Sequence, residues 1–548
     1  MVIIGSLLCI NLKAQEQATD TLKPTSNFKR WYQNLLPTPY DGPKNKLRIP
    51  MAVGYTDFDD NIRDLQLLGK LRLEQSLTIR PYILTPKLGY DSLLAMIDPE
   101  FENHGHLVER KYSDIQLLPI NFLQKYNSHH PYGWNDGPLS FSKGYQFVGS
   151  GGVYLRLGNI HLTLRPEFFK TASDPYQTSE LWGQRTSALS KLTLGQSSLR
   201  IDFGPLSVGA STQNLWLGPG RYSSLLMSNN APGFNHFNIQ TNRPLKTPLG
   251  SFEFSIIGGN LAFNKEQIFE HKNLKKAIQF NKSNRYLNLL SINFTPIFFK
   301  NIHLGANRAF QLFTQSEPSN NLTDYYLIAL KPLYRNVYQD NGSAIDQYIS
   351  GFIKYVFPKE HAEVYFEYGW NDGKSNLRDL TLDNSHSSAS ILGISKLQYL
   401  TKESYLKIEF ESTRMSQTPS YLQRNAGNWY EHGRLTEGYT NENQILGAGS
   451  GYGNNVQTFV ASLNKNFSKY GIKFQHIAHN PIGVTNILQV NGSSPYWNDF
   501  SYGVQVKQKF KNILFNLNTE WVHSNNYLWQ NHNKVSNVYI FFNTIYLW

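Results

Sequence analysis

Residues 501–511 read SYGVQVKQKFK, and this stretch indicates the fold. Its side chains alternate along a strand: one face holds Tyr502, Val504, Val506 and Phe510, and the other holds Gln505, Lys507, Lys509 and Lys511. A strand that is apolar on one side and charged on the other suits a sheet between lipid and water. A soluble β-sandwich also alternates, so this pattern alone does not say which face is wet.

The same alternation recurs along the chain, in residues 252–256, 362–367, 406–411 and 513–521. The last segment, 538–548, is apolar on one face and ends the chain on Trp548. A C-terminal amphipathic strand that closes on an aromatic residue resembles the assembly signal of outer-membrane barrels. The alternating segments are therefore predicted to be the strands of such a barrel.

The connections between these segments decide between the two classes. Tight turns near 158–159, 204–205, 243–248, 300–301, 358–361, 400–403, 466–469 and 511–512 alternate with much longer connections. Short periplasmic turns and long extracellular loops are typical of bacterial outer-membrane barrels. Counting segments, with 114–125 as the first despite Pro119, predicts about 18 antiparallel strands, an all-β transmembrane barrel with both ends in the periplasm.

Composition narrows the class of protein further. The 548 residues are 14% aromatic and 17% charged, with a formal net charge of +12. The basic residues are dispersed and form no basic helix or zinc-finger spacing, so nucleic acid is not an expected partner. The excess charge favours an anionic glycan or lipid partner, although it equally suits a solvated surface.

The first 112 residues differ from the rest. Residues 2–12 form the longest apolar run, too short for a spanning helix, so we predict a signal peptide over 1–14, truncated at its start and cleaved after Ala14. Cleavage there removes Cys9, the single cysteine, and excludes disulfides. Residues 15–112 lack the alternation and are predicted to form a partly helical periplasmic cap or plug, with residues 113–548 forming the barrel.

Within the N-terminal region, residues 61–77 read NIRDLQLLGKLRLEQSL. The apolar residues Ile62, Leu65, Leu68 and Leu71 follow helical spacing. This predicts a short amphipathic helix under or inside the barrel mouth, although residues 71–79 also suit a strand.

The stretch between two of the predicted strands, residues 213–237, reads QNLWLGPGRYSSLLMSNNAPGFNHF. Its glycines, prolines, paired asparagines, arginine and tryptophan suit a loop that presents hydrogen bonds around a sugar-sized ligand. Because an upward strand precedes it and a downward strand follows it, strand direction predicts that this loop faces the cell exterior, although part of it could instead fold inward and seal the barrel.

Two blocks of sequence resemble the Wzi family of outer-membrane capsule assembly proteins. The first lies at 214–231, with Asn214-Leu215-Trp216, Gly218-Pro219-Gly220 and Ser228-Asn229-Asn230-Ala231, and the second is QKYNSHHPYGWNDG at 124–137. The resemblance implies a barrel of similar strand number, closed at its periplasmic end by N-terminal helices. It also implies a surface lectin that tethers or organises exported polysaccharide and is not an enzyme. This chain departs from the family in showing one persuasive N-terminal helix.

Eight residues are candidates for polysaccharide binding: Trp216, Arg221, Asn229 and Asn230 in the first block, and Tyr132, Trp134, Asn135 and Asp136 in the second. Tryptophan would stack on a pyranose, Arg221 would pair with a uronate or phosphate, and the amides would hold hydroxyls. The tripeptide Trp-Asn-Asp recurs at 134–136, 370–372 and 497–499. It could contact sugar, but turn chemistry and the aromatic girdle of a barrel explain it equally.

The expected partners are an acidic surface polysaccharide, outer-membrane lipid and lipopolysaccharide, around a monomer in a Gram-negative outer membrane. No catalytic, metal or cofactor site is expected, because the chain lacks G-x-S-x-G and H-E-x-x-H, although a site assembled from scattered loop residues stays open. A diffusion channel is the main alternative, since six predicted lumen positions would suit a wet pore: Glu363, Glu367, Lys407, Glu409, Lys507 and Glu520.

Overall fold

The computed structural model describes residues 50–51, 53, 58–71, 75–83, 89–110, 112–176, 184–185, 188–264, 269–270, 284–313, 327–330, 345–371, 385–418, 427–432, 435–480 and 496–548. The predicted signal peptide, residues 1–14, lies outside the described residues. Within the described part of the chain, no helix is long and apolar enough to cross a membrane.

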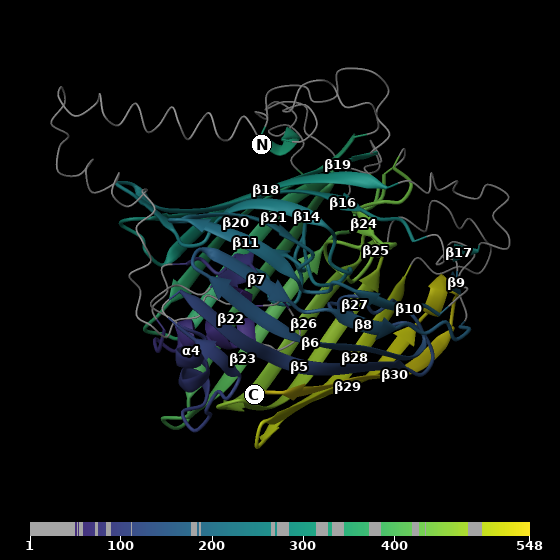
Figure 1. Cartoon of the computed structure of the whole chain (residues 1–548). Coiled ribbons are helices and arrows are strands. Elements are labelled where there is room, and N and C mark those ends of the chain that lie inside the picture. The colour runs from purple at the N-terminus through teal and green to yellow at the C-terminus, as the bar shows by residue number, and fades with distance from the viewer. Residues whose placement is uncertain are drawn as a thin grey trace.

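The described residues form a closed antiparallel barrel of 18 strands (Figure 1), which confirms the count from sequence. Three strands are interrupted and carry two labels each: β7 Ile160–Leu164 with β8 Glu167–Lys170, β10 Ser190–Thr193 with β11 Ser198–Phe203, and β14 His236–Thr241 with β15 Leu245–Thr247. The others are β5 Ser113–Asn127, β6 Gly144–Leu157, β12 Leu206–Ser211, β16 Gly250–Leu261, β18 Arg285–Pro296, β19 Ile302–Phe313, β20 Ile345–Phe357, β21 Ala362–Asn371, β22 Ser388–Tyr399, β23 Ser404–Arg414, β26 Asn455–Lys465, β27 Ser468–His479, β28 Trp497–Phe510, β29 Ile513–Asn525 and β30 Lys534–Tyr546.

The barrel closes where the last strand, β30, pairs with the first, β5, from Tyr539 opposite Asn127 to Tyr546 opposite Ile120. Pro119 does not prevent β5 from forming a strand. The register between β5 and β6 shifts between Leu118 and Asn121, so the proline lies at an irregularity where the ladder does not need its missing N–H. A short strand, β4 His106–Glu109, pairs with the start of β5.

The outer surface of the barrel is apolar and its interior is polar. On β28, Tyr502 and Val504 are 51% and 50% exposed, whereas Ser501, which directly precedes Tyr502, is 2% exposed. The same inversion holds on β29, where Trp521 is 54% exposed and Glu520 is 1% exposed. A soluble sandwich would lose free energy by exposing aromatic side chains and burying carboxylates, so these faces identify a barrel that spans a lipid bilayer.

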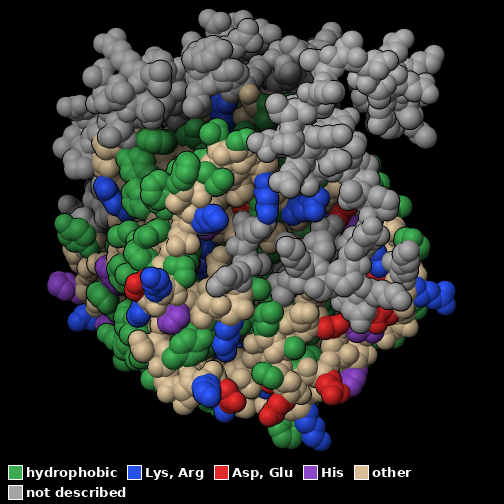
Figure 2. Space-filling model, turned by 90° about the vertical axis from the view of Figure 1, so that its left-hand side faces the viewer, with side chains coloured by type: hydrophobic (Ala, Val, Ile, Leu, Met, Phe, Trp, Pro, Cys, Tyr) green, Lys and Arg blue, Asp and Glu red, His purple; other side chains and the backbone are tan. Residues whose placement is uncertain are grey.

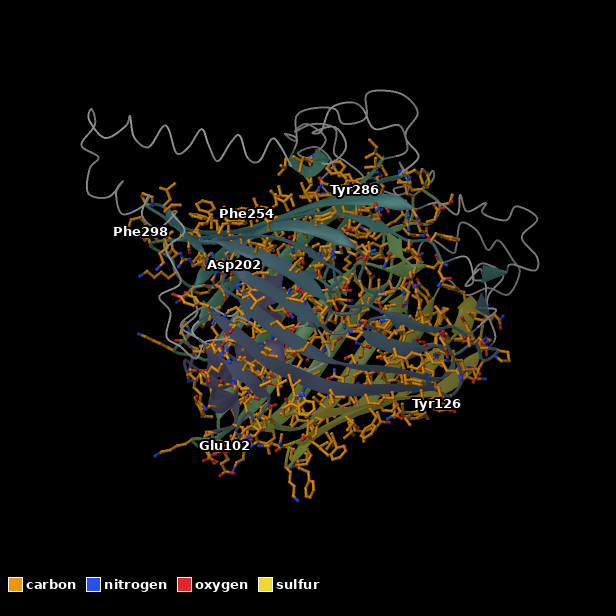
Figure 3. The ribbon with its side chains drawn as sticks, viewed as in Figure 1. Glu102, Tyr126, Asp202, Phe254, Tyr286 and Phe298 are labelled. Atoms are coloured by element: carbon orange, nitrogen blue, oxygen red, sulfur yellow. The ribbon has the colours of Figure 1, made fainter. Side chains whose placement is uncertain are left out.

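The two ends of the barrel differ. Phe298, in the turn between β18 and β19, and Tyr126, near the end of β5, lie at opposite ends (Figure 3). The first is the short-turn end, where a few residues join successive strands, as at 158–159 and 511–512. The second is the long-connection end, where the chain continues for many residues between strands. By the rule for outer-membrane barrels the short-turn end faces the periplasm.

Two helices of the N-terminal region lie at the short-turn end: α3 Phe58–Leu67 and α4 Tyr90–Ile97 (Figure 1). Their apolar faces share one buried cluster with the inner wall of the barrel, which includes Phe58, Ile62, Leu93, Tyr154, Leu514 and Ile545. Figure 2 looks onto this end, where described apolar, basic and other side chains lie side by side. The described part of the N-terminal region therefore packs into the barrel.

The predicted helix exists as α3, but it ends at Leu67, before the last residues of the apolar pattern, which runs to Leu71. It starts with Asp59 and Asp60, whose charges favour a helix N-terminus, and ends before Gly69, which adopts a φ of +71°. Among the described residues of the range 71–79, which omit 72–74, the strand alternative is met at Ile79, where β2 Ile79–Arg80 begins. The sequence pattern did not predict α4, because a helix of eight residues is too short to show a clear apolar periodicity.

The remaining short elements tie loops to one another. Pairs form between β1 Pro50–Met51 and β3 Tyr82–Ile83, between β9 Gln184–Arg185 and β17 Phe269–Glu270, and between β24 Thr440–Asn441 and β25 Gln444–Ile445. A fourth pair joins β2 to β13 Trp216–Leu217. Two 3₁₀ turns, η1 Ile328–Leu330 and η3 Tyr527–Trp529, lie in long connections.

Candidate functional site

The loop after β12 turns into the barrel. Its first residues form β13, which pairs with β2 so that Trp216 lies opposite Arg80 and Leu217 opposite Ile79. The backbone N–H of Gly218 then donates to the carbonyl of Thr78 at 2.8 Å. This loop therefore holds the N-terminal region by main-chain hydrogen bonds, deep inside the barrel.

The prediction that this loop faces the exterior is thus wrong for its first half. Trp216 is 3% exposed, and its indole Nε1 donates to the carbonyl of Gly220 at 3.1 Å. Arg221 is 8% exposed and bonds carboxylates of the wall and of α3. The physical reason is that the polar inner wall presents buried carboxylates, which pair with the loop's donors in a low dielectric.

Arg221 is the centre of a buried charge network. Its Nε donates to Oε1 of Glu363 on β21 at 2.8 Å, and its guanidinium lies 3.3 Å from Oδ1 of Asp64 on α3. Its backbone N–H donates to Oε2 of Glu411 on β23 at 2.7 Å. Lys407, beside Asp64 and Glu409, extends the network along the wall. One side chain therefore connects the loop, the barrel and the N-terminal helix.

Two further arginines bind the backbone of the same loop. Arg63 of α3 donates to the carbonyl of Pro219 at 2.7 Å and forms an ion pair with Glu363 at 2.9 Å. Arg80 of β2 donates to the carbonyl of Gly220 at 2.8 Å, pairs with Asp59 and lies over the Trp216 ring at 4.9 Å. The tight turn of the loop at this point requires glycine, because a Cβ at Gly220 would lie 1.9 Å from the carbonyl oxygen of Ser223.

The two sequence blocks, 124–137 and 214–231, contact each other, as expected for two parts of one site. Asn135 Nδ2 donates to the carbonyl of Tyr222 at 2.9 Å, and Asn229 Nδ2 donates to the carbonyl of Asn135 at 3.0 Å. The backbone N–H of Gly137 donates to the carbonyl of Asn229 at 2.8 Å. The loops after β5 and β12 are therefore one packed unit.

Most of the second block is buried as well. The Tyr132 hydroxyl lies within 2.6, 2.9 and 3.0 Å of acceptors on Gln475, Ser501 and Glu520 of the wall. Asp136 forms a buried ion pair with Lys125 at 2.5 Å. Burial raises the pKa of Asp136, and the Lys125 ammonium opposes that rise. Burial opposes the charge of Arg221 too, but Glu363 and Asp64 outweigh it and raise its pKa.

A third loop, between β23 and β26, completes this packing. The Tyr430 hydroxyl donates to the carbonyl of Leu225 at 2.8 Å, and the N–H of Ser228 donates to the carbonyl of Leu446 at 2.8 Å. Trp429, Tyr430 and Tyr439 are buried in one cluster with the loop after β12. The sequence showed these aromatic residues in a long loop but gave no signal that they fill the barrel.

Of the eight candidate residues, five are buried: Trp216, Arg221, Asn229, Tyr132 and Asp136. Trp134, Asn135 and Asn230 are half-buried. These three lie where the three loops meet, since Asn230 donates to the carbonyl of Ile445 at 2.9 Å and a Cβ at Gly449 would touch both Asn230 and Trp134. Among the described residues, no group of three or more His, Cys, Asp and Glu side chains is placed to hold a metal ion.

A family model described as capsule assembly protein Wzi matches residues 126–535. This chain belongs to the Wzi family. The match includes most of one block and all of the other, which confirms the resemblance, and the lipid-facing barrel makes this Wzi-family protein an outer-membrane protein.

One solved structure in particular shares the fold of this Wzi-family chain, and two others are similar only at low TM-scores. Wzi of Escherichia coli, described as a carbohydrate-binding β-barrel involved in group 1 capsule assembly, matches with a TM-score of 0.62 at 12% identity, over 91% of this chain and 100% of that one. OccK5 of Pseudomonas aeruginosa matches with a TM-score of 0.38 at 7% identity, over 80% and 99% of the two chains. OprD of the same organism gives 0.35 at 8%, over 78% and 92%. No curated protein sequence matches the chain.

Proposed function

We propose that this protein binds an exported, acidic polysaccharide at its long-connection end and helps to attach it to the cell surface. Three observations support this: the chain belongs to the Wzi family, the E. coli member is described as carbohydrate-binding, and three polar and aromatic loops converge inside the barrel. The role is non-enzymatic, and the net charge of +12 favours an anionic polymer.

The single observation that carries the proposal is the packed junction of the three loops. There, Trp134, Asn135 and Asn230 combine an aromatic face with two amides, the residue types that stack on a pyranose and hold its hydroxyls. The five buried candidates pack inside the barrel and hold the loops that form this junction in place. We assign residues 15–112 to a periplasmic plug and residues 1–14 to a removed signal peptide, in a monomer surrounded by lipid and lipopolysaccharide.

The channel alternative loses its main support. The six lumen side chains that suggested a wet pore, namely Glu363, Glu367, Lys407, Glu409, Lys507 and Glu520, are each at most 5% exposed. Glu363 bonds Arg63 and Arg221, and Glu520 bonds Lys473 at 2.8 Å. Side chains in a water-filled lumen would be hydrated rather than paired in this way.

The test combines binding with conductance. The full-length protein in detergent is titrated with acidic polysaccharide purified from the cells that carry it, and with neutral dextran as a control. Saturable binding of the first, together with no steady conductance in a planar bilayer, is the expected result. A large steady open state without polysaccharide binding would instead establish a channel.

A further inference from the structure

The three Trp-Asn-Asp tripeptides occupy different positions in the barrel. Trp370 shares the lipid face of β21 with Phe366, which is 40% exposed, and its ring lies 5.0 Å from that of Tyr368. This copy belongs to the aromatic girdle. Trp497 instead shares the inner face of β28 with Asp499 and Ser501, both 2% exposed. Trp134 of the first copy lies in the loop junction described above, whereas the third copy places its tryptophan on a strand, at the inner rim of the long-connection end.

Trp497 is the centre of a group of six rings, which we name the rim cluster: His129, His130, His479, Trp497, Tyr527 and Trp529. The His479 ring stacks on Trp497 with centroids 3.7 Å apart and an interplanar angle of 16°. The rings of Tyr527 and Trp529 are inclined to that of Trp497 by 75° and 89°, with centroids 5.1 and 4.9 Å away. His130 lies 4.8 Å from Tyr527. Four separate segments of the chain thus bring aromatic rings to one place.

The rim cluster holds polar groups in defined positions. Asp499 accepts a hydrogen bond from Trp497 Nε1 at 2.8 Å, and its other oxygen lies 2.7 Å from His479 Nε2. These two hydrogen bonds fix the orientation of the Trp497 and His479 rings. Trp497 itself stays half-buried, so part of its surface is accessible.

Two buried nitrogens in the rim cluster have no hydrogen-bond partner among the described residues. They are Nε1 of Trp529 and Nε2 of His130, on side chains that are each 2% exposed. An indole N–H can only donate, and burying it without an acceptor is unfavourable. A ligand oxygen that reached either nitrogen would give it the hydrogen-bond partner that the described residues do not supply.

The backbone of the same segment is strained. Asn526, Leu528, Trp529 and His532 have φ values of 53°, 56°, 57° and 62°, in the left-handed region that residues other than glycine rarely adopt. Such strain persists only where surrounding contacts determine it, and it is concentrated at ligand-binding segments. Here the contacts are the rings of Trp497 and His130, which hold Trp529 and Tyr527 in place.

We propose that the rim cluster binds one pyranose unit of the exported polysaccharide, with the accessible part of the Trp497 ring against the C–H face of the sugar. Trp529 Nε1, which is buried in the unbound protein, donates to a sugar oxygen when the Tyr527–Trp529 turn shifts on binding. His130 Nε2 contacts a second oxygen. A pyranose fits because it offers both an apolar face and several oxygens within a few ångström. This inference rests on the proposed function and locates a binding unit at a position distinct from the junction of Trp134, Asn135 and Asn230.

The first test exploits the repeated tripeptide. Trp497→Ala and its matched control Trp370→Ala are purified as full-length protein and titrated with the acidic polysaccharide from the producing cells. We expect Trp497→Ala to weaken binding at least about tenfold and Trp370→Ala to leave it within about twofold. Equal affinities of Trp497→Ala and wild type would overturn the inference, whereas no binding by wild type would overturn the proposed function first.

A second variant separates binding from folding. Trp529→Phe keeps a ring but removes the unpartnered donor, so we expect thermal stability to be unchanged or higher while affinity falls about fivefold. A purely structural tryptophan would give the opposite result, with stability lost and affinity retained. If Trp497→Ala does not fold, Trp497→Phe keeps the packing, and the change in tryptophan fluorescence on adding polysaccharide should become smaller, with the remainder coming from the other tryptophans. A change as large as that of wild type would contradict the inference.

Discussion

Arg221 reaches across the barrel interior to Glu363, with Nε and Oε1 2.8 Å apart although the two residues are 142 positions apart in sequence. The same guanidinium pairs with Asp64 on α3, so the loop after β12, the wall and the N-terminal region share one buried charge network. Removing one member of such a network leaves the others buried without their counter-charge.

Arg221→Ala should therefore loosen the N-terminal region inside the barrel. We expect a loss of about 3–5 kcal/mol in stability, since the carboxylates of Glu363 and Asp64 would lose a buried partner. Thermal unfolding measures the stability, and planar-bilayer conductance measures whether the barrel opens. The control is Lys191→Ala, which breaks the pair with Glu442 at a lysine that is 43% exposed, and should change stability by less than about 1 kcal/mol. Unchanged stability and conductance in Arg221→Ala would contradict the network's role.

Gly220→Ala tests the shape of the loop. The new Cβ would lie 1.9 Å from the carbonyl oxygen of Ser223, so the loop must move away from Arg80 and Trp216. We expect destabilisation of about 2 kcal/mol or more, read out by thermal unfolding of the assembled barrel. In Gly351→Ala, by comparison, the nearest atom is 3.9 Å away, and stability should stay near that of wild type. Similar behaviour of both variants would show that Gly220 is replaceable.

Substitutions of the candidate sugar-binding residues should have different effects according to how exposed each side chain is. Trp134→Ala and Asn230→Ala alter half-buried side chains at the loop junction and should each reduce polysaccharide affinity about tenfold with little loss of stability. Trp216→Ala removes a 3% exposed ring beneath Arg80 and should lower stability by about 3 kcal/mol or more. Isothermal titration together with thermal unfolding distinguishes the two effects. If Trp216→Ala lost binding while keeping its full stability, Trp216 would be a sugar contact rather than a structural residue.

His130 predicts a pH dependence of stability. Burial lowers its pKa from 6.5 to about 4, with Asp499 opposing and His129 and His479 reinforcing the shift. The unfolded chain therefore binds a proton that the folded chain does not, so the stability is fully present above about pH 6.5 and falls by about 3 kcal/mol as the pH drops to 4.

The measurement is the melting temperature across this pH range for wild type and His130→Asn. We expect the variant to lose part of the dependence, because Asn cannot take up the proton. His129→Asn is the matched control, since His129 is half-buried and should contribute less. Identical pH profiles for wild type and His130→Asn would show that another group causes the effect.

The barrel was predictable because its signal is local. Alternation of Tyr502 and Val504 with Lys507 and Lys509 sets the two faces of a strand from neighbouring residues alone, and turn lengths set the direction of the next strand. The same local signals gave the family through its two blocks and the presence of a helix at α3, although α3 begins at Phe58, before the predicted range of 61–77. They failed at α4, which is too short for periodicity, and at the end of α3, where Gly69 stops the helix.

Local patterns could not give the path of the loop after β12. Strand direction says only that this loop leaves the long-connection end, and its composition suits an exposed ligand-binding loop. Whether it turns outward or inward depends on Glu363, Glu411 and Asp64, which the chain brings together only once the barrel has closed.

The sequence by itself thus determined the number of strands, the face that meets lipid and the end where the long loops emerge, because each follows from spacing between near neighbours. Only the tertiary structure decided that Trp216 and Arg221 lie buried while Trp134, Asn230 and Trp497 keep accessible surface. The physical reason is that a buried donor must find its acceptor, and here the acceptors lie on strands far along the chain.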